Sequence, residues 1–167
     1  MTYLLDANVF IQAKNLHYGF DFCPAFWDWL DHQAATVRVR SIEKVADELK
    51  AGADDLATWA TARPDFFAKP DAPVVASLRA VSAWATSEHY DPAAVNTFLQ
   101  VADYYLVAHA HAHGLTVVTH EVPANSAKKI KIPNACIGLA IKCMTPYAML
   151  RLERARFVLG GAAEDIV

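Results

Sequence analysis

The sequence lacks an apolar run of the roughly 20 residues that a membrane-spanning helix needs, and its short apolar start is broken by Asp6. We therefore expect neither a signal peptide nor membrane contact, and a cytoplasmic location. Cysteine is scarce, because only Cys23, Cys136 and Cys143 occur, without zinc-site spacing. An odd number of thiols does not close into a disulfide set, so reduced cysteines are expected.

Motifs of several common enzyme classes are also missing. The sequence has no glycine-rich phosphate loop, which argues against a P-loop NTPase or a Rossmann cofactor enzyme. No serine or cysteine lies in a nucleophile-elbow pattern. His109, His111 and His113 lack the neighbouring Glu of a zinc protease, and we interpret them as histidines of a last helical turn that interact with the helix dipole. The alternative is metal binding by His109 and His113.

What the 167 residues do contain is enough apolar material for a full core. Hydrophobic residues make up 54% and charged residues 20% of the chain, with a net charge of -3. This composition is typical of a folded domain. The weak negative charge argues against broad electrostatic capture of nucleic acid, although a local basic patch is compatible with it. We expect one domain over residues 1–159 and a flexible tail over 160–167.

Strand patterns alternate with helical patterns along the chain. Strands are predicted at 2–5, 36–39, 115–119 and 129–132. Helices are predicted at 24–32, 42–50, 54–62, 73–88, 91–113, 135–143 and 145–154, with Ser41 and Asn134 among their N-caps. This alternation predicts a parallel α/β sheet with helices on its faces.

Four carboxylates stand where a lone charge is costly to bury. They are Asp6 after the first strand, Glu48 beside the apolar face of helix 42–50, Asp103 within an apolar helix, and Glu121 after strand 115–119. Ligands collect at the carboxyl ends of parallel strands, where Asp6 and Glu121 both fall. Four acids that converge would form an oxygen-rich pocket for Mg²⁺ or Mn²⁺, which suggests phosphodiester chemistry.

Each acid also has an ordinary interpretation. Asp6 can cap a following helix, Asp103 can face solvent on a polar stripe, and Glu121 can be a loop residue. Glu43 and Glu48 flank the apolar face of their helix on opposite sides. The residues alone favour neither of these two.

Basic residues gather in two places. Lys128, Lys129 and Lys131 follow Glu121 and are suited either to phosphate contact or to a solvated loop. A second cationic region, interpreted as a surface face, contains Arg151, Arg154 and Arg156.

The ordered set of motifs resembles the PIN (PilT N-terminus) ribonuclease domain, including VapC-type toxins of toxin–antitoxin pairs. The matching pieces are Leu4-Leu5-Asp6-Ala7-Asn8, Val45-x-x-Glu48-Leu49, Ala102-Asp103-x-x-Leu106-Val107-Ala108-His109-Ala110 and Val117-Val118-Thr119-x-Glu121. They cover about residues 2–121 in the right order and spacing. The ending, from 129 to 150, is similar to an uncharacterised PIN-like branch.

The resemblance implies a three-layer α/β/α fold with a central parallel sheet of about four to five strands. It implies a metal-dependent endoribonuclease that acts as the toxin of a type II toxin–antitoxin system. An RNA substrate, a cognate antitoxin protein and a homodimer follow from the same resemblance.

The resemblance also implies roles for individual residues. Asp6 and Asp103 would bind Mg²⁺ or Mn²⁺ directly, and Glu48 and Glu121 would complete the cage directly or through water. The family pattern is what selects Glu48 over Glu43.

The resemblance implies supporting roles for four further residues. Asn8 and Thr119 would orient a water molecule or the phosphate. Lys129 and Lys131 would contact RNA phosphate.

Two departures from the family pattern leave alternatives open. The fourth acid is usually Asp, whereas this chain has Glu121, and the stretch 124–131 is longer than usual. A PIN-like module that binds RNA or protein without cutting is therefore the main alternative. A phosphatase of the haloacid dehalogenase type is disfavoured, because Asn8 stands where that chemistry needs a second acid.

Overall fold

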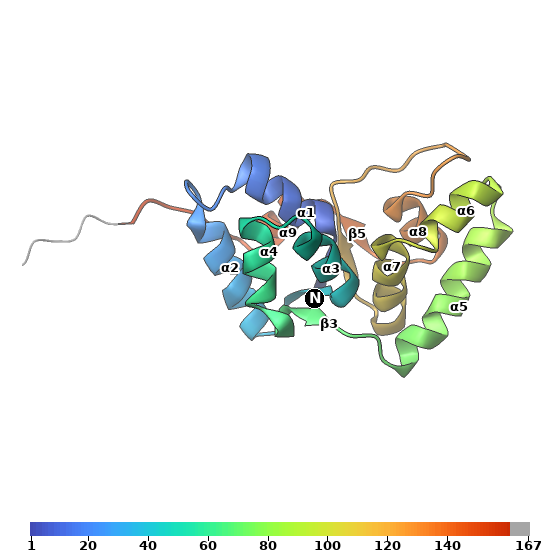
Figure 1. Ribbon diagram of the computed structural model, residues 1–167, viewed down its shortest axis with the longest axis horizontal. Coiled ribbons are helices and arrows are strands. Elements are labelled where there is room, and N and C mark those ends of the chain that lie inside the picture. The colour runs from blue at the N-terminus through green and yellow to red at the C-terminus, as the bar shows by residue number, and fades with distance from the viewer. Residues whose placement is uncertain (161–167) are drawn as a thin grey trace, which may run out of the picture.

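The computed structural model describes residues 1–160 and contains a five-stranded, entirely parallel sheet in the order β3-β2-β1-β4-β5 (Figure 1). Its strands are β1 (Tyr3–Leu5), β2 (Val39–Ile42), β3 (Phe67–Ala68), β4 (Thr116–Val118) and β5 (Cys143–Met144). Leu4 at the centre pairs with Arg40 on one side and Val117 on the other. The predicted parallel α/β architecture is confirmed.

Helices cover both faces of this sheet. They are α1 (Ala7–Gln12), α2 (Pro24–Ala35), α3 (Glu43–Ala51), α4 (Asp55–Thr61), α5 (Ala72–Ser87), α6 (Pro92–Phe98), α7 (Ala102–His113), α8 (Ile132–Gly138) and α9 (Pro146–Leu152). A π-helical segment, η1 (Ala13–His17), extends α1, and a 3₁₀ turn, η2 (Pro64–Phe66), precedes β3. In Figure 1, α1 to α4 and α9 lie on one side and α5 to α8 on the other.

The core lies where the central strands are buried on both faces. Every residue of β1 and of β4 is buried. Strands of this kind are short continuous apolar runs because helices pack on both of their sides. That is why residues 2–5 and 115–119 were recognisable as strands from the sequence.

The predicted single helix over 91–113 is wrong, because the chain turns between α6 and α7. Val101 is extended (φ −107°, ψ 166°) and begins α7. Apolar residues continue across the turn, since Phe98 and Leu106 are both core residues, and the hydrophobic pattern therefore hides it. As a result Asp103 lies in the first turn of a helix, where a negative charge interacts favourably with the helix dipole.

The predicted strand over 129–132 is also wrong, since Lys131 is the residue that precedes α8. Asn134 caps no helix; its side chain accepts from the Ala124 N–H and donates to the Ala124 carbonyl, both at 3.0 Å. The helix predicted to reach 143 ends at Gly138, and Ala140 has φ 55°. The following residues form β5, which pairs with Val117 and Val118.

Ser41 is not the helix cap that was predicted. It lies in β2, and its hydroxyl donates to the Leu5 carbonyl at 2.6 Å. The predicted strand 36–39 is therefore shifted toward the C-terminus, and α1, β3 and β5 were not anticipated. The three cysteines are free, as expected.

Among residues 1–160, no helix has the length and apolar character required to cross a membrane. The predicted tail lies outside the described residues except for Gly160.

Candidate functional site

The strand order places a crevice between β1 and β4. Successive strands move outward from β1 in one direction to β3, and the chain then returns to the other side to form β4 and β5. In open α/β sheets, ligands bind at the carboxyl ends of the strands where the order reverses. Asp6 follows β1 and Thr119 follows β4, so both stand at this point.

Asp6 is a buried carboxylate, with 5% of its surface exposed. It occupies the N-cap position of α1, yet its side chain makes no capping hydrogen bond. Burial, followed by the negative charge of Asp103, raises the pKa of Asp6 to about 7. Its Oδ2 accepts a 2.8 Å hydrogen bond from the Thr119 hydroxyl, which acts in the opposite direction.

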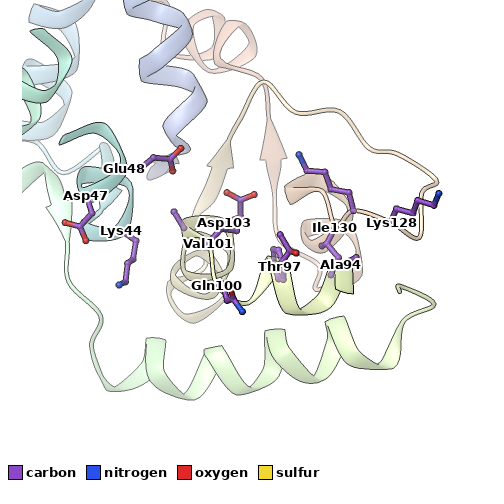
Figure 2. Close-up of a pocket in the computed structure, with 13 residues that line it drawn as sticks. Lys44, Asp47, Glu48, Ala94, Thr97, Gln100, Val101, Asp103, Lys128 and Ile130 are labelled. Atoms are coloured by element: carbon purple, nitrogen blue, oxygen red, sulfur yellow. The ribbon is translucent and has the colours of Figure 1, made fainter. Parts of the chain in front are cut away.

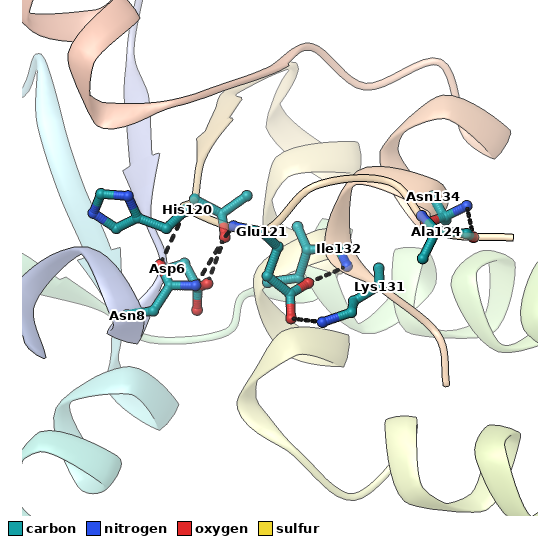
Figure 3. A network of polar contacts seen from close by, with 9 residues as sticks. Asp6, Asn8, His120, Glu121, Ala124, Lys131, Ile132 and Asn134 are labelled. Carbon is teal, nitrogen blue, oxygen red and sulfur yellow. Dashed lines mark hydrogen bonds and ion pairs between the residues drawn. The ribbon is translucent and has the colours of Figure 1, made fainter. Parts of the chain in front are cut away.

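Thr119 and Asn8 form a polar network around Asp6 (Figure 3). The Thr119 oxygen accepts from Asn8 Nδ2 and from the Glu121 N–H, each at 3.1 Å. Asn8 Oδ1 accepts from the His120 N–H at 3.1 Å. These bonds fix the chain that leaves β4 against the chain that leaves β1. Their contact with water or phosphate remains a prediction.

Asp103 interacts electrostatically with each of the other three predicted acids. Burial, followed by the charges of Glu121 and Glu48, raises its pKa to about 6, while the positive charge of Lys129 opposes the increase. Asp103 also raises the pKa of Asp6. The structure therefore brings all four predicted acids into one electrostatic neighbourhood.

A hollow of about 620 Å³ opens beside Asp103 (Figure 2). Its wall includes Glu48, Lys128 and Lys129, whereas Asp6 and Glu121 are not on it. Figure 2 shows the Glu48 carboxylate on the side of α3 that faces Asp103, with Asp47 turned away. Partial burial raises the pKa of Glu48. Glu43 is not among the lining residues, and the metal role of Glu48 stays a prediction.

Glu121 is engaged by the start of α8. Its Oε2 accepts a 2.8 Å hydrogen bond from the Ile132 N–H, and its Oε1 lies 3.5 Å from Lys131 Nζ. Figure 3 shows both contacts. The sequence carried no signal for this anchoring, because a loop separates the residues. Both Glu121 and Lys131 have partners within the chain, in addition to the metal and RNA roles predicted for them.

The donor chemistry of the site fits a hard divalent cation. Asp6 and Asp103 are carboxylates whose pKa values are raised by burial and by neighbouring negative charge, and such a cation favours oxygen ligands. Within residues 1–160, however, no three His, Cys, Asp or Glu side chains are grouped closely enough to hold an ion as they stand. Shared coordination therefore requires the carboxylates to turn toward one another.

The histidines near the end of α7 are engaged separately. His111 Nδ1 lies 3.0 Å from the Ser77 hydroxyl, and His113 Nε2 lies 3.0 Å from an Asp71 carboxylate oxygen. His109 is buried, and this burial lowers its pKa to about 4. The contacts of His111 and His113 agree with a structural interpretation of these histidines.

Sequence comparison identifies the family. The family described as Domain of unknown function (DUF4411) matches residues 3–157, which is nearly the whole chain. The chain belongs to the DUF4411 family. No curated protein matches this DUF4411 sequence.

Solved structures show what the DUF4411 chain resembles in three dimensions. FitAcB from Neisseria gonorrhoeae aligns with a TM-score of 0.53 and 19% identity, over 87% of this chain and 99% of that chain. VapBC2 from Rickettsia felis, crystallised with a DNA fragment from its promoter, aligns with a TM-score of 0.53 and 16% identity, over 87% and 98%. At these identities the likeness concerns the fold. The expected α/β fold, with a central parallel sheet flanked by helices, is confirmed and is shared with these two structures.

Proposed function

We propose that this DUF4411 protein is a metal-dependent endoribonuclease and the toxin component of a type II toxin–antitoxin pair. The observation that carries the proposal is that burial raises the pKa of both Asp6 and Asp103, which come from distant segments, and that the negative charge of Asp103 raises the pKa of Asp6 further. The charge of Asp103 destabilises the charged form of the buried Asp6 carboxylate, so holding the two acids near one another costs free energy when no cation is bound. A divalent cation held by these residues would offset that cost.

In this proposal Asp6 and Asp103 would hold the ion, with the Glu48 carboxylate of α3 as a further oxygen ligand. When bound, a Mg²⁺ or Mn²⁺ ion lowers the pKa of a water molecule and offsets charge on the phosphate. Thr119 keeps the Asp6 carboxylate oriented through its 2.8 Å hydrogen bond. Glu121 contributes negative charge near Asp103 while its oxygens anchor α8.

The RNA strand enters along the hollow beside Asp103. Lys129 lies on its wall and already acts on the Asp103 carboxylate. Its ammonium group is therefore placed to offset charge on a phosphate next to the acids. Lys131 is a weaker candidate for this role, because its Nζ is paired with Glu121.

The direct test is cleavage of single-stranded RNA with Mg²⁺ or Mn²⁺ present, compared with the same reaction in a chelator. We expect cleavage by the unmodified chain and a loss of at least about 100-fold in Asp6→Asn and in Asp103→Asn, because each removes charge needed to hold the ion. Asp47→Asn is the matched control, since Asp47 is an exposed acid of α3 that lines the same hollow. Equal activity in all variants would remove the proposal.

The toxin assignment has its own test. Similarity to VapBC2, which was crystallised with a DNA fragment from its promoter, supports a partner protein for this chain. We expect expression of the chain alone to slow bacterial growth and expression of Asp103→Asn to leave growth unchanged. A cognate antitoxin would relieve the arrest, and homodimer formation would be measured by light scattering.

A second function is favoured by one observation: the Glu121 carboxylate is committed to Ile132 and Lys131. On this alternative the protein is a PIN-like module that binds RNA or a partner without cutting. Titration with Mn²⁺ during thermal unfolding distinguishes the two. An ion-binding site stabilises the folded state by about 2.7 kcal/mol at 100 times its Kd, whereas a degenerate site leaves the melting temperature unchanged.

A further inference from the structure

Three aromatic side chains that the acid site does not use meet beside it. The rings of His17 and His120 have centroids 5.5 Å apart, and each lies 5.6 Å from the ring of Tyr147. The Tyr147 hydroxyl lies 3.0 Å from His17 Nε2. We call these three residues the aromatic platform. They come from η1, from the chain after β4 and from α9, so the fold alone assembles them.

The aromatic platform is attached directly to the acid site. His120 stands between Thr119, which binds Asp6, and Glu121. Its backbone N–H is held by Asn8 Oδ1 at 3.1 Å. Figure 3 shows the His120 ring turned away from Glu121, on the Asn8 side of the network. The platform therefore adjoins the Asp6 network through His120 and shares no residue with the lining of the hollow.

The platform remains open to solvent and has positive charge nearby. Tyr147 is 36% exposed, and His17 and His120 are half-buried. Arg151 lies four residues after Tyr147 in α9, and residues at this spacing share one face of a helix. Both Tyr147 and Arg151 act electrostatically on Tyr18, which places them in one region.

We propose that His17, His120 and Tyr147 bind a nucleobase of single-stranded RNA by stacking, next to the phosphate held at the acid site. This inference rests on the proposed ribonuclease function and names the substrate as unpaired RNA. Proteins that bind single strands combine aromatic faces for the bases with cationic side chains for the backbone. The aromatic platform with Arg151 supplies the first kind of group beside Asp6, and Lys129 on the wall of the Asp103 hollow supplies the second.

A ring triad with polar edges suits a base better than an apolar protein segment. These rings carry imidazole nitrogens and a phenol hydroxyl at their edges, and an unstacked nucleobase offers hydrogen-bond donors and acceptors in its plane that can match them. The Tyr147 ring plane lies at 82° to that of His17 and at 66° to that of His120, so a base would stack on one exposed ring while the other rings present polar edges to it.

The test measures binding of a fluorescently labelled, single-stranded oligoribonucleotide to the full chain by anisotropy, in a chelator so that the RNA stays intact. We expect Tyr147→Leu and His17→Leu each to weaken binding about 5- to 100-fold, the range that loss of one stacked base produces. Tyr147→Phe keeps the ring and should bind within about twofold of the unmodified chain. Phe22→Leu is the matched control, because Phe22 is an exposed ring (65%) in the loop before α2.

Equal affinity of all four variants overturns the proposal, as does an unmodified chain that binds no single-stranded RNA. Circular dichroism of each variant checks that it is folded, and Tyr147 is an exposed residue of α9. Because binding is measured without divalent ions, the result is independent of catalysis. If RNA binding depends on these rings but no metal-dependent cleavage is found, the ribonuclease proposal is wrong and the base-stacking proposal is supported.

Discussion

The Thr119 hydroxyl donates a 2.8 Å hydrogen bond to Asp6 Oδ2, although 113 positions separate the two residues in the chain. The bond joins the chain that leaves β1 to the chain that leaves β4. It also favours the charged form of a carboxylate that burial and Asp103 destabilise. The Thr119 hydroxyl therefore does two things: it holds the segments after β1 and β4 together, and it stabilises the charged form of Asp6.

Replacing Thr119 by Val tests this link. The substitution keeps the shape of the side chain but leaves Asp6 Oδ2 and Asn8 Nδ2 without this partner. We expect the free energy of unfolding to fall by about 1–3 kcal/mol. Urea denaturation measures it. Thr86→Val is the control, because the Thr86 hydroxyl bonds only a carbonyl of its own exposed helix and its loss should change stability by under about 0.5 kcal/mol.

Stability without divalent ions should depend on pH through Asp6. The pKa of Asp6 is about 7 in the folded chain and 3.8 ordinarily. Between these values the folded state keeps a proton that the unfolded state releases, so stability falls as pH rises from about 4 to 7. Asp103, with a pKa of about 6, contributes in the same direction. Asp6→Asn should therefore gain stability relative to the unmodified chain by on the order of 2–4 kcal/mol across this window.

The measurement is a series of urea unfolding curves in chelator, analysed as the difference between Asp6→Asn and the unmodified chain. Taking the difference cancels the pH-dependent contributions of the ionisable groups that both proteins share. Asp47→Asn serves as the control, because it removes an exposed carboxylate of α3 by the same substitution. A flat difference for Asp6→Asn as well would show that Asp6 is not destabilised by its surroundings.

His109 should produce the opposite trend. Burial lowers its pKa from 6.5 to about 4, so below pH 6.5 the unfolded state binds a proton that the folded state excludes. Stability from this group is therefore present above pH 6.5 and is lost as pH falls toward 4. Between pH 7.5 and pH 4.5, we expect the unfolding free energy of His109→Gln to fall less than that of the unmodified chain, by on the order of 1–2 kcal/mol. The difference in unfolding free energy between the two proteins at pH 7.5 and pH 4.5 measures it.

Two substitutions at Glu121 separate its anchoring role from its charge. Glu121→Ala removes the acceptor for the Ile132 N–H and should cost about 1 kcal/mol. Glu121→Gln keeps an acceptor and should retain most of that stability, yet it removes the charge that raises the pKa of Asp103. Unfolding measures the first effect and the pH of half-protonation of Asp103, followed by NMR, measures the second. Equal stability losses in both variants would contradict the anchoring role.

Much of the fold was predictable because its signals are local. Buried strands read as apolar runs, and proline with a polar residue before it marked the start of α9, where Thr145 Oγ1 accepts from the Ala148 N–H at 3.2 Å. Gly114 ends α7 with φ 63°, a conformation that glycine adopts without strain. Two-residue strands such as β3 and β5 carry no such signal, since only pairing with a neighbour defines them.

The candidate site divides in the same way. The sequence by itself determined which acids stand at strand ends and within apolar stretches, because burying a charge is costly wherever the chain folds. Only the tertiary structure decided that Asp103 lies in the first turn of a helix and that Glu121 anchors α8. It also decided that the rings of His17, His120 and Tyr147 contact one another. These relationships join segments far apart in the chain, and contacts of that kind depend on how layers pack rather than on any local pattern of residues.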